Sequence, residues 1–185
     1  MPGNIEDKFA NQRAFLVYMY SHPGKKLSFM GNEYGQFKEW DYNDGLEFFM
    51  LDFDLHKKLH NFTKDINVLY KNSTPFYEIE DSWDGFNWIL PDESQSNVIC
   101  YERVDKKGNK IVVIINFSGK DIDKYCLGVD EGTYSILLCS DDVKYGGSGK
   151  IKKKTYTAIR KREHGKEFSI SFRLPKLSGL YFVKK

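Results

Sequence analysis

Residues 22–40 read His-Pro-Gly-Lys-Lys-Leu-Ser-Phe-Met-Gly-Asn-Glu-Tyr-Gly-Gln-Phe-Lys-Glu-Trp, and they follow a segment with helical periodicity. Between Ile5 and Tyr20 the apolar residues recur at helical spacing, which predicts a helix of about four turns. The proline and glycine that open the quoted stretch end this pattern. The run 27–30 is short and apolar, so it predicts a buried strand after the helix.

A second helix is predicted over residues 54–71. Asp54 is a suitable N-cap residue. The apolar side chains that follow it step by four, three, four and three residues, at Leu55, Leu59, Phe62, Ile66 and Leu69. The irregular stretch before this helix, residues 32–53, has a length typical of functional or packed irregular segments.

From residue 75 onward, short apolar runs alternate with turn residues, which predicts an antiparallel all-β domain. The predicted strands are Phe86–Leu90, Val98–Val104, Ile111–Phe117, Thr133–Cys139, Phe168–Leu174 and Leu180–Val183. Residues 107–109 predict a hairpin turn, residues 111–115 a central strand, and residues 145–150 a flexible loop. Strict alternation over 168–174 predicts one buried face and one wet face. We therefore expect two domains, 1–74 and 75–185.

The composition narrows the class of protein. With 185 residues, 41% hydrophobic and 29% charged, the chain is typical of a soluble globular protein. A net charge of +2 favours neither a nucleic-acid binder nor a protein for acidic ligands. Three cysteines without metal-ligand spacing and no secretion signal favour the cytoplasm, and no apolar run reaches the roughly 20 residues that span a membrane. We expect no metal, cofactor, nucleic-acid or membrane partner.

Three blocks carry a family resemblance: Phe9-Ala10-Asn11-Gln12-Arg13, residues 22–36, and Glu39-Trp40. Weaker elements follow in the same order at residues 69–70, 75–78, 85–89, 116–117 and 145–149. Together they resemble the C-terminal portion of glycogen (1,4-alpha-glucan) branching enzymes, in glycoside hydrolase family 13 of the alpha-amylase superfamily. The resemblance spans nearly the whole chain.

This resemblance implies a mixed fold class. Residues 5–20 would be the seventh helix, 27–30 the eighth strand and 54–71 the eighth helix of a (β/α)8 barrel. The domain of residues 75–185 would then be an all-β antiparallel sandwich that packs against the last barrel helix. The N-terminal domain would be a helix–strand–helix remnant of the barrel.

The resemblance also implies a reaction. Branching enzymes cleave an α-1,4-glucan, hold it as a covalent glycosyl-enzyme on a carboxylate, and transfer it to a 6-hydroxyl to form an α-1,6 branch. In the family, the nucleophile, the acid/base and a stabilising aspartate come from barrel strands four, five and seven. All three would precede Met1, so we expect no catalytic residue in this chain and no activity of the chain alone.

The implied partners are α-1,4-glucan or glycogen and the missing N-terminal part of the same enzyme. A second copy of the chain is a further candidate, because an exposed strand edge at residues 27–30 would invite pairing.

The loop after Met30 would line the glucan cleft, because barrel active sites are built at the C-terminal ends of the strands. Its candidate glucan-binding residues are Glu33, Tyr34, Gln36, Glu39 and Trp40. Aromatic rings pack on the apolar face of a sugar, while amides and carboxylates bond to its hydroxyls. The alternative is that the polar side chains only support an irregular loop.

A second candidate group is Leu46, Glu47 and Phe48, which lies where branching enzymes have a leucine, an acid and an aromatic residue associated with glucan contact. Phe48 stands where the family has tryptophan. Core packing is the favoured alternative for this group.

Other signals are weaker. The acidic cluster of Glu39, Asp41, Asp44 and Glu47 fits no calcium loop. His56 and His60 lack a third zinc ligand. The basic runs 150–154 and 160–162 are typical of a solvated face.

Trp83 and Trp88 are candidates for a carbohydrate platform on the β domain. A role in the sandwich core or at an interface is the favoured alternative. A stand-alone carbohydrate-binding or scaffold sandwich is the rival function. It is disfavoured because such a module has no need of barrel helices.

Overall fold

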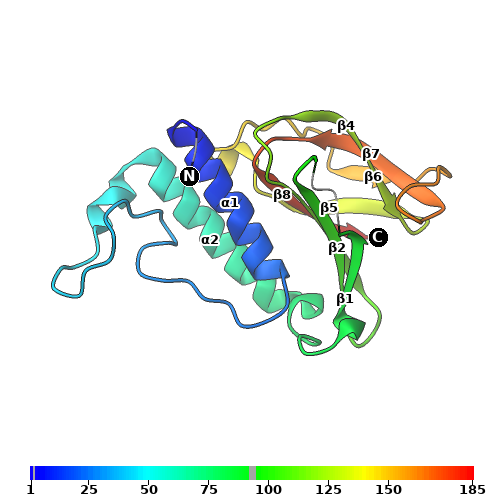
Figure 1. Ribbon diagram of the computed structural model, residues 1–185, viewed down its shortest axis with the longest axis horizontal. Coiled ribbons are helices and arrows are strands. Elements are labelled where there is room, and N and C mark those ends of the chain that lie inside the picture. Colours follow the sequence, from blue (N-terminus) through cyan, green and yellow to red (C-terminus); the bar gives the residue numbers. More distant parts are fainter. Residues whose placement is uncertain (2, 92–94) are drawn as a thin grey trace.

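The computed structural model describes residues 1, 3–91 and 95–185. In this part of the chain two long helices, a six-stranded antiparallel sheet and a two-stranded antiparallel sheet form three successive layers (Figure 1). The all-β antiparallel domain is confirmed, and so are the two helices.

The helices are α1, Ile5–Ser21, and α2, Asp54–Asn72. Asn4 caps α1, since its side-chain oxygen accepts a hydrogen bond from the Asp7 amide at 2.8 Å. In α2, Phe53 occupies the cap position, so the expectation of an Asp54 cap was wrong by one residue. Asp54 instead lies in the first turn, where the helix dipole favours a negative charge.

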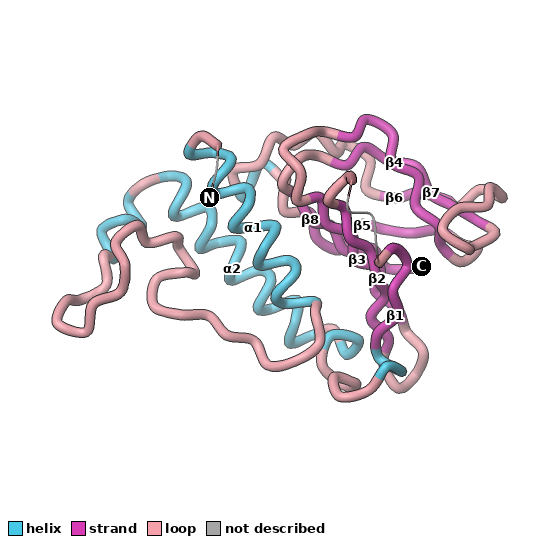
Figure 2. The backbone as a smooth tube through the Cα atoms, in the orientation of Figure 1, coloured by secondary structure: helices cyan, strands magenta, loops and turns pink. Residues whose placement is uncertain are grey.

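The two helices run in the same direction. The ring centroids of Phe9 and His56 lie 4.8 Å apart, and the Tyr20 hydroxyl donates to the Asn67 side chain at 2.9 Å. Both contacts join residues 47 positions apart, so the helices are parallel neighbours. The connection between them returns along the side of the pair that faces away from the strands (Figure 2). Consecutive helices of a (β/α)8 barrel have this arrangement.

The predicted strand at residues 27–30 is absent. These residues form no ladder with the rest of the described chain, and Leu27 is 77% exposed. An isolated apolar run cannot form a strand without a neighbour that accepts its backbone hydrogen bonds. Because residues 27–30 are not a strand, the strand edge invoked for self-association is also missing.

The short 3-10 helices are η1, Phe48–Asp52; η2, Thr74–Phe76; η3, Trp83–Gly85; and η4, Val143–Tyr145. The strands are β1, Phe86–Leu90; β2, Val98–Val104; β3, Lys110–Asn116; β4, Ile122–Val129; β5, Thr133–Cys139; β6, Thr155–Thr157; β7, Phe168–Leu174; and β8, Ser178–Lys184. The larger sheet has the order β1-β2-β3-β8-β5-β6, and β4 pairs with β7. Strands β4 and β6 were not predicted.

The central strands of the six-stranded sheet are buried on both faces. Toward the helices, Tyr101, Val113 and Tyr181 pack with Leu16 and Val17 of α1. The opposite face packs against β4 and β7 through a second cluster that includes Val112, Ile114, Leu180, Phe182, Leu127, Ile170 and Phe172. Residues 111–115 of strand β3 are therefore apolar and buried on both faces, as predicted for a central strand.

The loop at residues 145–150 is held in place. Asp141 accepts hydrogen bonds from the Ser148 amide at 2.8 Å and from its hydroxyl at 2.6 Å. Tyr145 is buried and donates to Asp65 of α2 at 2.6 Å. The expectation of a flexible loop was wrong. It rested on the glycine content of the stretch, whereas the loop is held by hydrogen bonds to Asp141 and Asp65, which lie outside it.

Candidate functional site

Helix α2 positions the first candidate residues through their backbone. The His56 imidazole lies 2.8 Å from the carbonyl oxygen of Tyr34, and the Thr63 hydroxyl donates to the carbonyl of Glu33 at 3.0 Å. Both anchors were missed from the sequence, although His56 and Thr63 lie on the same helical stripe as Leu59. They fix the turn that contains Glu33 and Tyr34.

Tyr34, Gln36 and Glu47 form one hydrogen-bond network. The Gln36 side-chain oxygen accepts from the Tyr34 hydroxyl at 2.8 Å and from the Glu47 amide at 3.0 Å. Tyr34 is buried, and burial raises its pKa. Gly31 and Gly35, at φ +84° and +75°, allow the tight turn around this network. Gln36 thus bonds within the loop, and its contact with glucan stays a prediction.

Glu47 has an unusual environment for a carboxylate. Within the described chain, its Oε2 is a buried side-chain oxygen without a hydrogen-bond partner. Buried acceptors are normally paired, because an unpaired one loses its hydration without compensation. This oxygen is available to a hydrogen-bond donor.

The other candidates lie at the surface. Trp40 is 44% exposed and meets the Phe29 ring edge at a centroid distance of 5.4 Å. Phe48 is 60% exposed, with its ring 6.0 Å from that of Tyr34, so the core role favoured for Phe48 was wrong. Glu39 is exposed and Leu46 is partly buried. The structure thus joins Tyr34, Gln36, Glu47 and Phe48, and it pairs Trp40 with Phe29.

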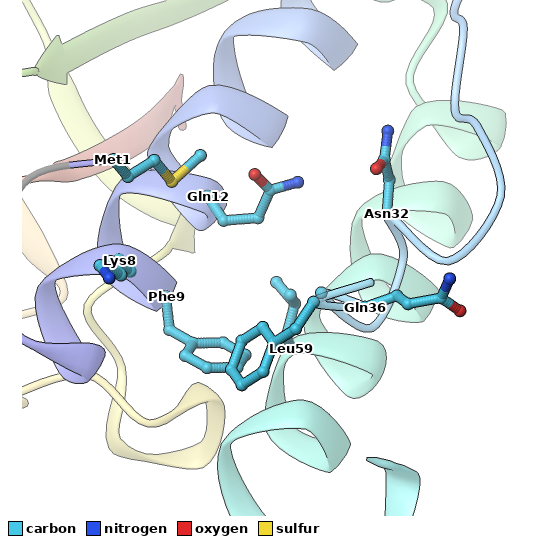
Figure 3. A pocket seen from close by; sticks show the side chains of 9 residues that line it. Met1, Lys8, Phe9, Gln12, Asn32, Gln36 and Leu59 are labelled. Carbon is cyan, nitrogen blue, oxygen red and sulfur yellow. The ribbon is translucent and has the colours of Figure 1, made fainter. Parts of the chain in front are cut away.

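A cavity of about 230 Å³ lies between α1 and this loop. Figure 3 shows Gln12 extending from α1 toward the hollow, whereas the Gln36 amide points away from it. The lining residues are Met1, Lys8, Phe9, Gln12, Asn32, Gly35, Gln36, Phe37 and Leu59. Gln36 alone among the candidates borders this cavity, so the cavity is not the predicted glucan site.

Residues considered as possible metal ligands have other partners in the structure. Lys38 pairs with Asp44 of the acidic cluster, and His56 already contacts the Tyr34 carbonyl. Across the described ranges, no three His, Cys, Asp or Glu side chains group as metal ligands. No helix there is both long and apolar enough to cross a bilayer.

The two tryptophans of the β domain are at the surface. Trp83 is 76% exposed and Trp88 is 41% exposed, so a core role is wrong for both, whereas the interface role stays a prediction. Strand β1 is an edge strand, which leaves part of its surface uncovered by neighbouring elements.

Comparison with known proteins gives consistent matches. Residues 88–185 match the family described as "Alpha amylase, C-terminal all-beta domain". The 1,4-alpha-glucan branching enzyme GlgB of Halothermothrix orenii is 40% identical, over 98% of this chain and 29% of its own length. The GlgB enzymes of Aquifex aeolicus and Vibrio parahaemolyticus are 39% and 38% identical, each over 98% of this chain. The chain spans 24 to 29% of the length of these three relatives.

Solved structures show the same fold at low identity. An alpha-amylase from H. orenii superposes with a TM-score of 0.59 and 14% identity, over 97% of this chain and 36% of its own. A Nostoc punctiforme debranching enzyme gives 0.58 and 15%, over 95% of this chain and 31% of its own. The sheet architecture and the match over residues 88–185 lead to one assignment: the chain belongs to the family of alpha-amylase C-terminal all-beta domains.

Proposed function

We propose that this chain is the C-terminal part of a 1,4-alpha-glucan branching enzyme, with the catalytic carboxylates supplied by a preceding part of the protein. The observation that carries the proposal is the 40% identity to such an enzyme over 98% of the chain. The parallel α1–α2 pair with its return connection supports it, because consecutive barrel helices are arranged in this way. The division after Thr74 into barrel remnant and sandwich belongs to the same proposal.

The preceding part of the enzyme is the proposed protein partner. The connection between α1 and α2 exposes large apolar side chains at Leu27, Phe29, Met30, Phe37, Trp40, Tyr42, Phe48, Phe49 and Phe53. Apolar surface concentrated in one segment marks an interaction site. A barrel wall would cover much of this surface. A hydrogen-bond donor from the barrel or the glucan would pair with the Oε2 atom of Glu47.

We assign the proposed glucan contacts to the exposed members of the candidate set. Trp40 and Phe48 offer ring faces, while Glu39 offers an exposed carboxylate. This combination suits a pyranose, which has apolar C–H faces and a rim of hydroxyls. Free thiols at Cys100, Cys126 and Cys139 are consistent with the proposed cytoplasmic location.

A chimera tests the branching proposal. Residues 1–185 would replace the homologous segment of the H. orenii branching enzyme, and the product formed from amylose would be analysed by NMR for α-1,6 linkages. We expect a folded chimera that makes branches, whereas residues 1–185 alone make none. A chimera that folds but makes no branches would contradict the proposal.

The glucan role of the loop is tested in the same chimera. Trp40→Ala should raise the KM for amylose roughly three- to tenfold, from the loss of one aromatic contact. Tyr42→Ala is the matched control, because Tyr42 is an 80% exposed aromatic residue of the same segment outside the candidate set. Equal KM values for Trp40→Ala and the parent chimera would remove Trp40 from the proposed site.

A further inference from the structure

The outer layer of the sandwich presents a partly exposed cysteine. Cys126 lies on β4, which pairs with β7 in the layer farthest from the helices (Figure 1). Side chains alternate along a strand, and the neighbouring Leu127 belongs to the core cluster between the two sheets, so Cys126 points away from that core. Of the three cysteines, Cys126 keeps part of its surface accessible, whereas Cys100 and Cys139 are buried.

The Cys126 thiol has two polar neighbours. Its sulfur accepts a hydrogen bond from the Lys161 ammonium at 3.4 Å and lies 3.5 Å from the hydroxyl oxygen of the buried Ser169. The bond to Cys126 raises the pKa of Lys161, which stays positively charged at neutral pH. The hydroxyl can turn to donate to a sulfur anion. Reactive cysteines occur beside cations at partly exposed positions, and Cys126 meets both conditions.

The fold holds Lys161 over β4. Lys161 precedes a tight turn in which the backbones of Glu163 and Lys166 bond to each other. In the same turn, the Nδ1 atom of His164 accepts from the Gly128 amide at 3.2 Å. A β-carbon at Gly128 would lie 2.1 Å from the Glu163 carbonyl oxygen, so the turn packs directly on the strand. Backbone packing therefore places the ammonium beside the sulfur.

The surface around the thiol is positively charged. Arg160 and Arg162 flank Lys161 in the chain, and all three side chains are exposed. Lys124 is also exposed and lies two residues before the thiol on the same face of β4. Glu163, whose carboxylate lies 3.7 Å from the Lys161 ammonium, offsets part of this charge. Such a surface favours a reagent that has carboxylates.

Burial keeps the other two thiols out of this chemistry. It raises the pKa of Cys139 to about 12 and that of Cys100 well above its usual value. A thiol must lose its proton before it attacks a disulfide, so both remain unreactive in the folded chain. Exchange in the native chain is thus directed to Cys126.

We propose that Cys126 is a modification site that forms a mixed disulfide with a small acidic disulfide, represented by glutathione disulfide. The thiol gives its proton to solvent, and the resulting thiolate attacks one sulfur of the disulfide. The sulfur–sulfur bond of glutathione disulfide breaks, a bond between Cys126 and one glutathione forms, and the other glutathione leaves as a thiolate. The Cys126 sulfur is oxidised and the leaving sulfur is reduced, so the step needs no further oxidant. The carboxylates of the bound glutathione pair with Lys124 and Lys161.

Mass spectrometry tests the site. The folded 185-residue chain is incubated with glutathione disulfide at neutral pH, and the mass of the chain and of its peptides is then measured. We expect a single glutathione, located on Cys126 and removed by dithiothreitol. Cys126→Ser should stay unmodified, whereas the parent chain unfolded in urea should also react at Cys100 and Cys139.

Reaction rates test the role of charge. Lys161→Gln should slow the reaction with glutathione disulfide roughly three- to tenfold, and Lys161→Arg should restore most of the rate. The same Lys161→Gln change should slow the reaction with cystamine less, because cystamine is a cationic disulfide that Lys161 repels. Lys71→Gln, which removes an exposed lysine of α2, is the matched control and should leave both rates unchanged. Circular dichroism of each variant checks that the fold is intact.

The inference is overturned if Cys126 gains no glutathione in the folded chain or if Cys100 or Cys139 carries the adduct instead. It is also overturned if Lys161→Gln reacts at the parent rate with both disulfides. None of these measurements uses a glucan or a catalytic reaction, so their outcome is independent of the chimera and of the proposed branching function.

Discussion

The Tyr181 hydroxyl of β8 donates a 2.6 Å hydrogen bond to the backbone carbonyl oxygen of Val17 in α1. The same carbonyl accepts from the Ser21 hydroxyl at 2.6 Å, and Ser21 in turn lies 2.6 Å from the Tyr101 hydroxyl of β2. This buried cluster joins the last turns of the first helix to the centre of the six-stranded sheet. The helical layer and the sheet are thus connected by polar bonds within an apolar interface.

Tyr181→Phe should destabilise the chain by about 1 kcal/mol. The substitution removes one hydrogen bond but leaves the Val17 carbonyl paired with Ser21, so the loss stays near the ordinary value for one bond. Urea denaturation measures it. Tyr156→Phe, whose hydroxyl bonds to the Lys153 carbonyl in a partly buried position, is the control and should cost less. A larger effect for Tyr156 would contradict the importance of the α1–sheet cluster.

Gly179→Ala should separate α1 from the sheet. A β-carbon at this position would lie 2.6 Å from Cγ1 of Val17 and 2.8 Å from its Cβ, which is too close for either element to remain in place. We expect a loss of about 1–3 kcal/mol. Val17→Ala would remove the Cγ1 clash but keep the 2.8 Å approach to Cβ, so the double variant should be less destabilised than the sum of the single changes without regaining the stability of the parent. Strict additivity in urea denaturation would mean that these two residues do not share the predicted contact.

Lowering the pH should reduce the free energy of unfolding, because Asp105 becomes protonated. Burial alone would raise the pKa of Asp105, but hydrogen bonds from Thr74, Asn109 and Lys107 outweigh it and lower this pKa from 3.8 to about 2. Because the folded-state pKa is the lower one, the stabilisation is complete above about pH 4 and is lost as the pH falls toward 2. It amounts to about 1–2 kcal/mol.

Asp105→Asn tests this linkage. The variant should be less stable at pH 7, because the new amide faces the Asn109 amide donor, and its unfolding free energy should change less between pH 4 and pH 2. Asp123→Asn, at a carboxylate that is 84% exposed, is the control and should follow the parent curve closely. If the parent and Asp105→Asn curves remain parallel, Asp105 is not the titrating group.

Gln36→Leu should loosen the candidate loop. The change leaves the Tyr34 hydroxyl and the Glu47 amide without their shared acceptor, at a cost of about 1–3 kcal/mol. Hydrogen exchange should become faster at the Glu47 amide. Gln12→Leu removes an amide on the other side of the neighbouring cavity and serves as the control. Unchanged exchange at Glu47 in Gln36→Leu would show that the loop does not depend on this network.

Periodic segments were predictable because their burial repeats along the chain. The bounds of β1, β2, β5 and β7 match the predicted ones, and both helices were found to within a residue or so. Strand β4 begins with polar residues and β6 has only three residues, so neither gives a periodic signal. Ser169 was expected on a wet face but is buried, because Ile159 pairs beside it and Cys126 contacts it.

The site was harder to predict, because exposure depends on neighbours distant in the sequence. The turn at Glu33 and Tyr34 could be picked out as a candidate, yet its anchoring by His56 and Thr63 appears only when α2 lies against it. Trp88 alternates correctly for a strand, but its exposure follows from the position of β1 at the sheet edge. The apolar run at 27–30 was predicted as a strand but is not one, because a strand requires a neighbouring strand as well as a suitable sequence pattern.

The double-sided burial of the six-stranded sheet limits how this protein can be cut or recombined. A break at residue 74 would strip the helices from the face that contains Tyr101, Val113 and Tyr181, and it would leave those side chains in water. A sandwich transplanted without its helices would therefore tend to aggregate. The smallest exchangeable unit is the sheet together with both helices, so recombination between related enzymes should succeed at junctions before Ile5 rather than after Asn72.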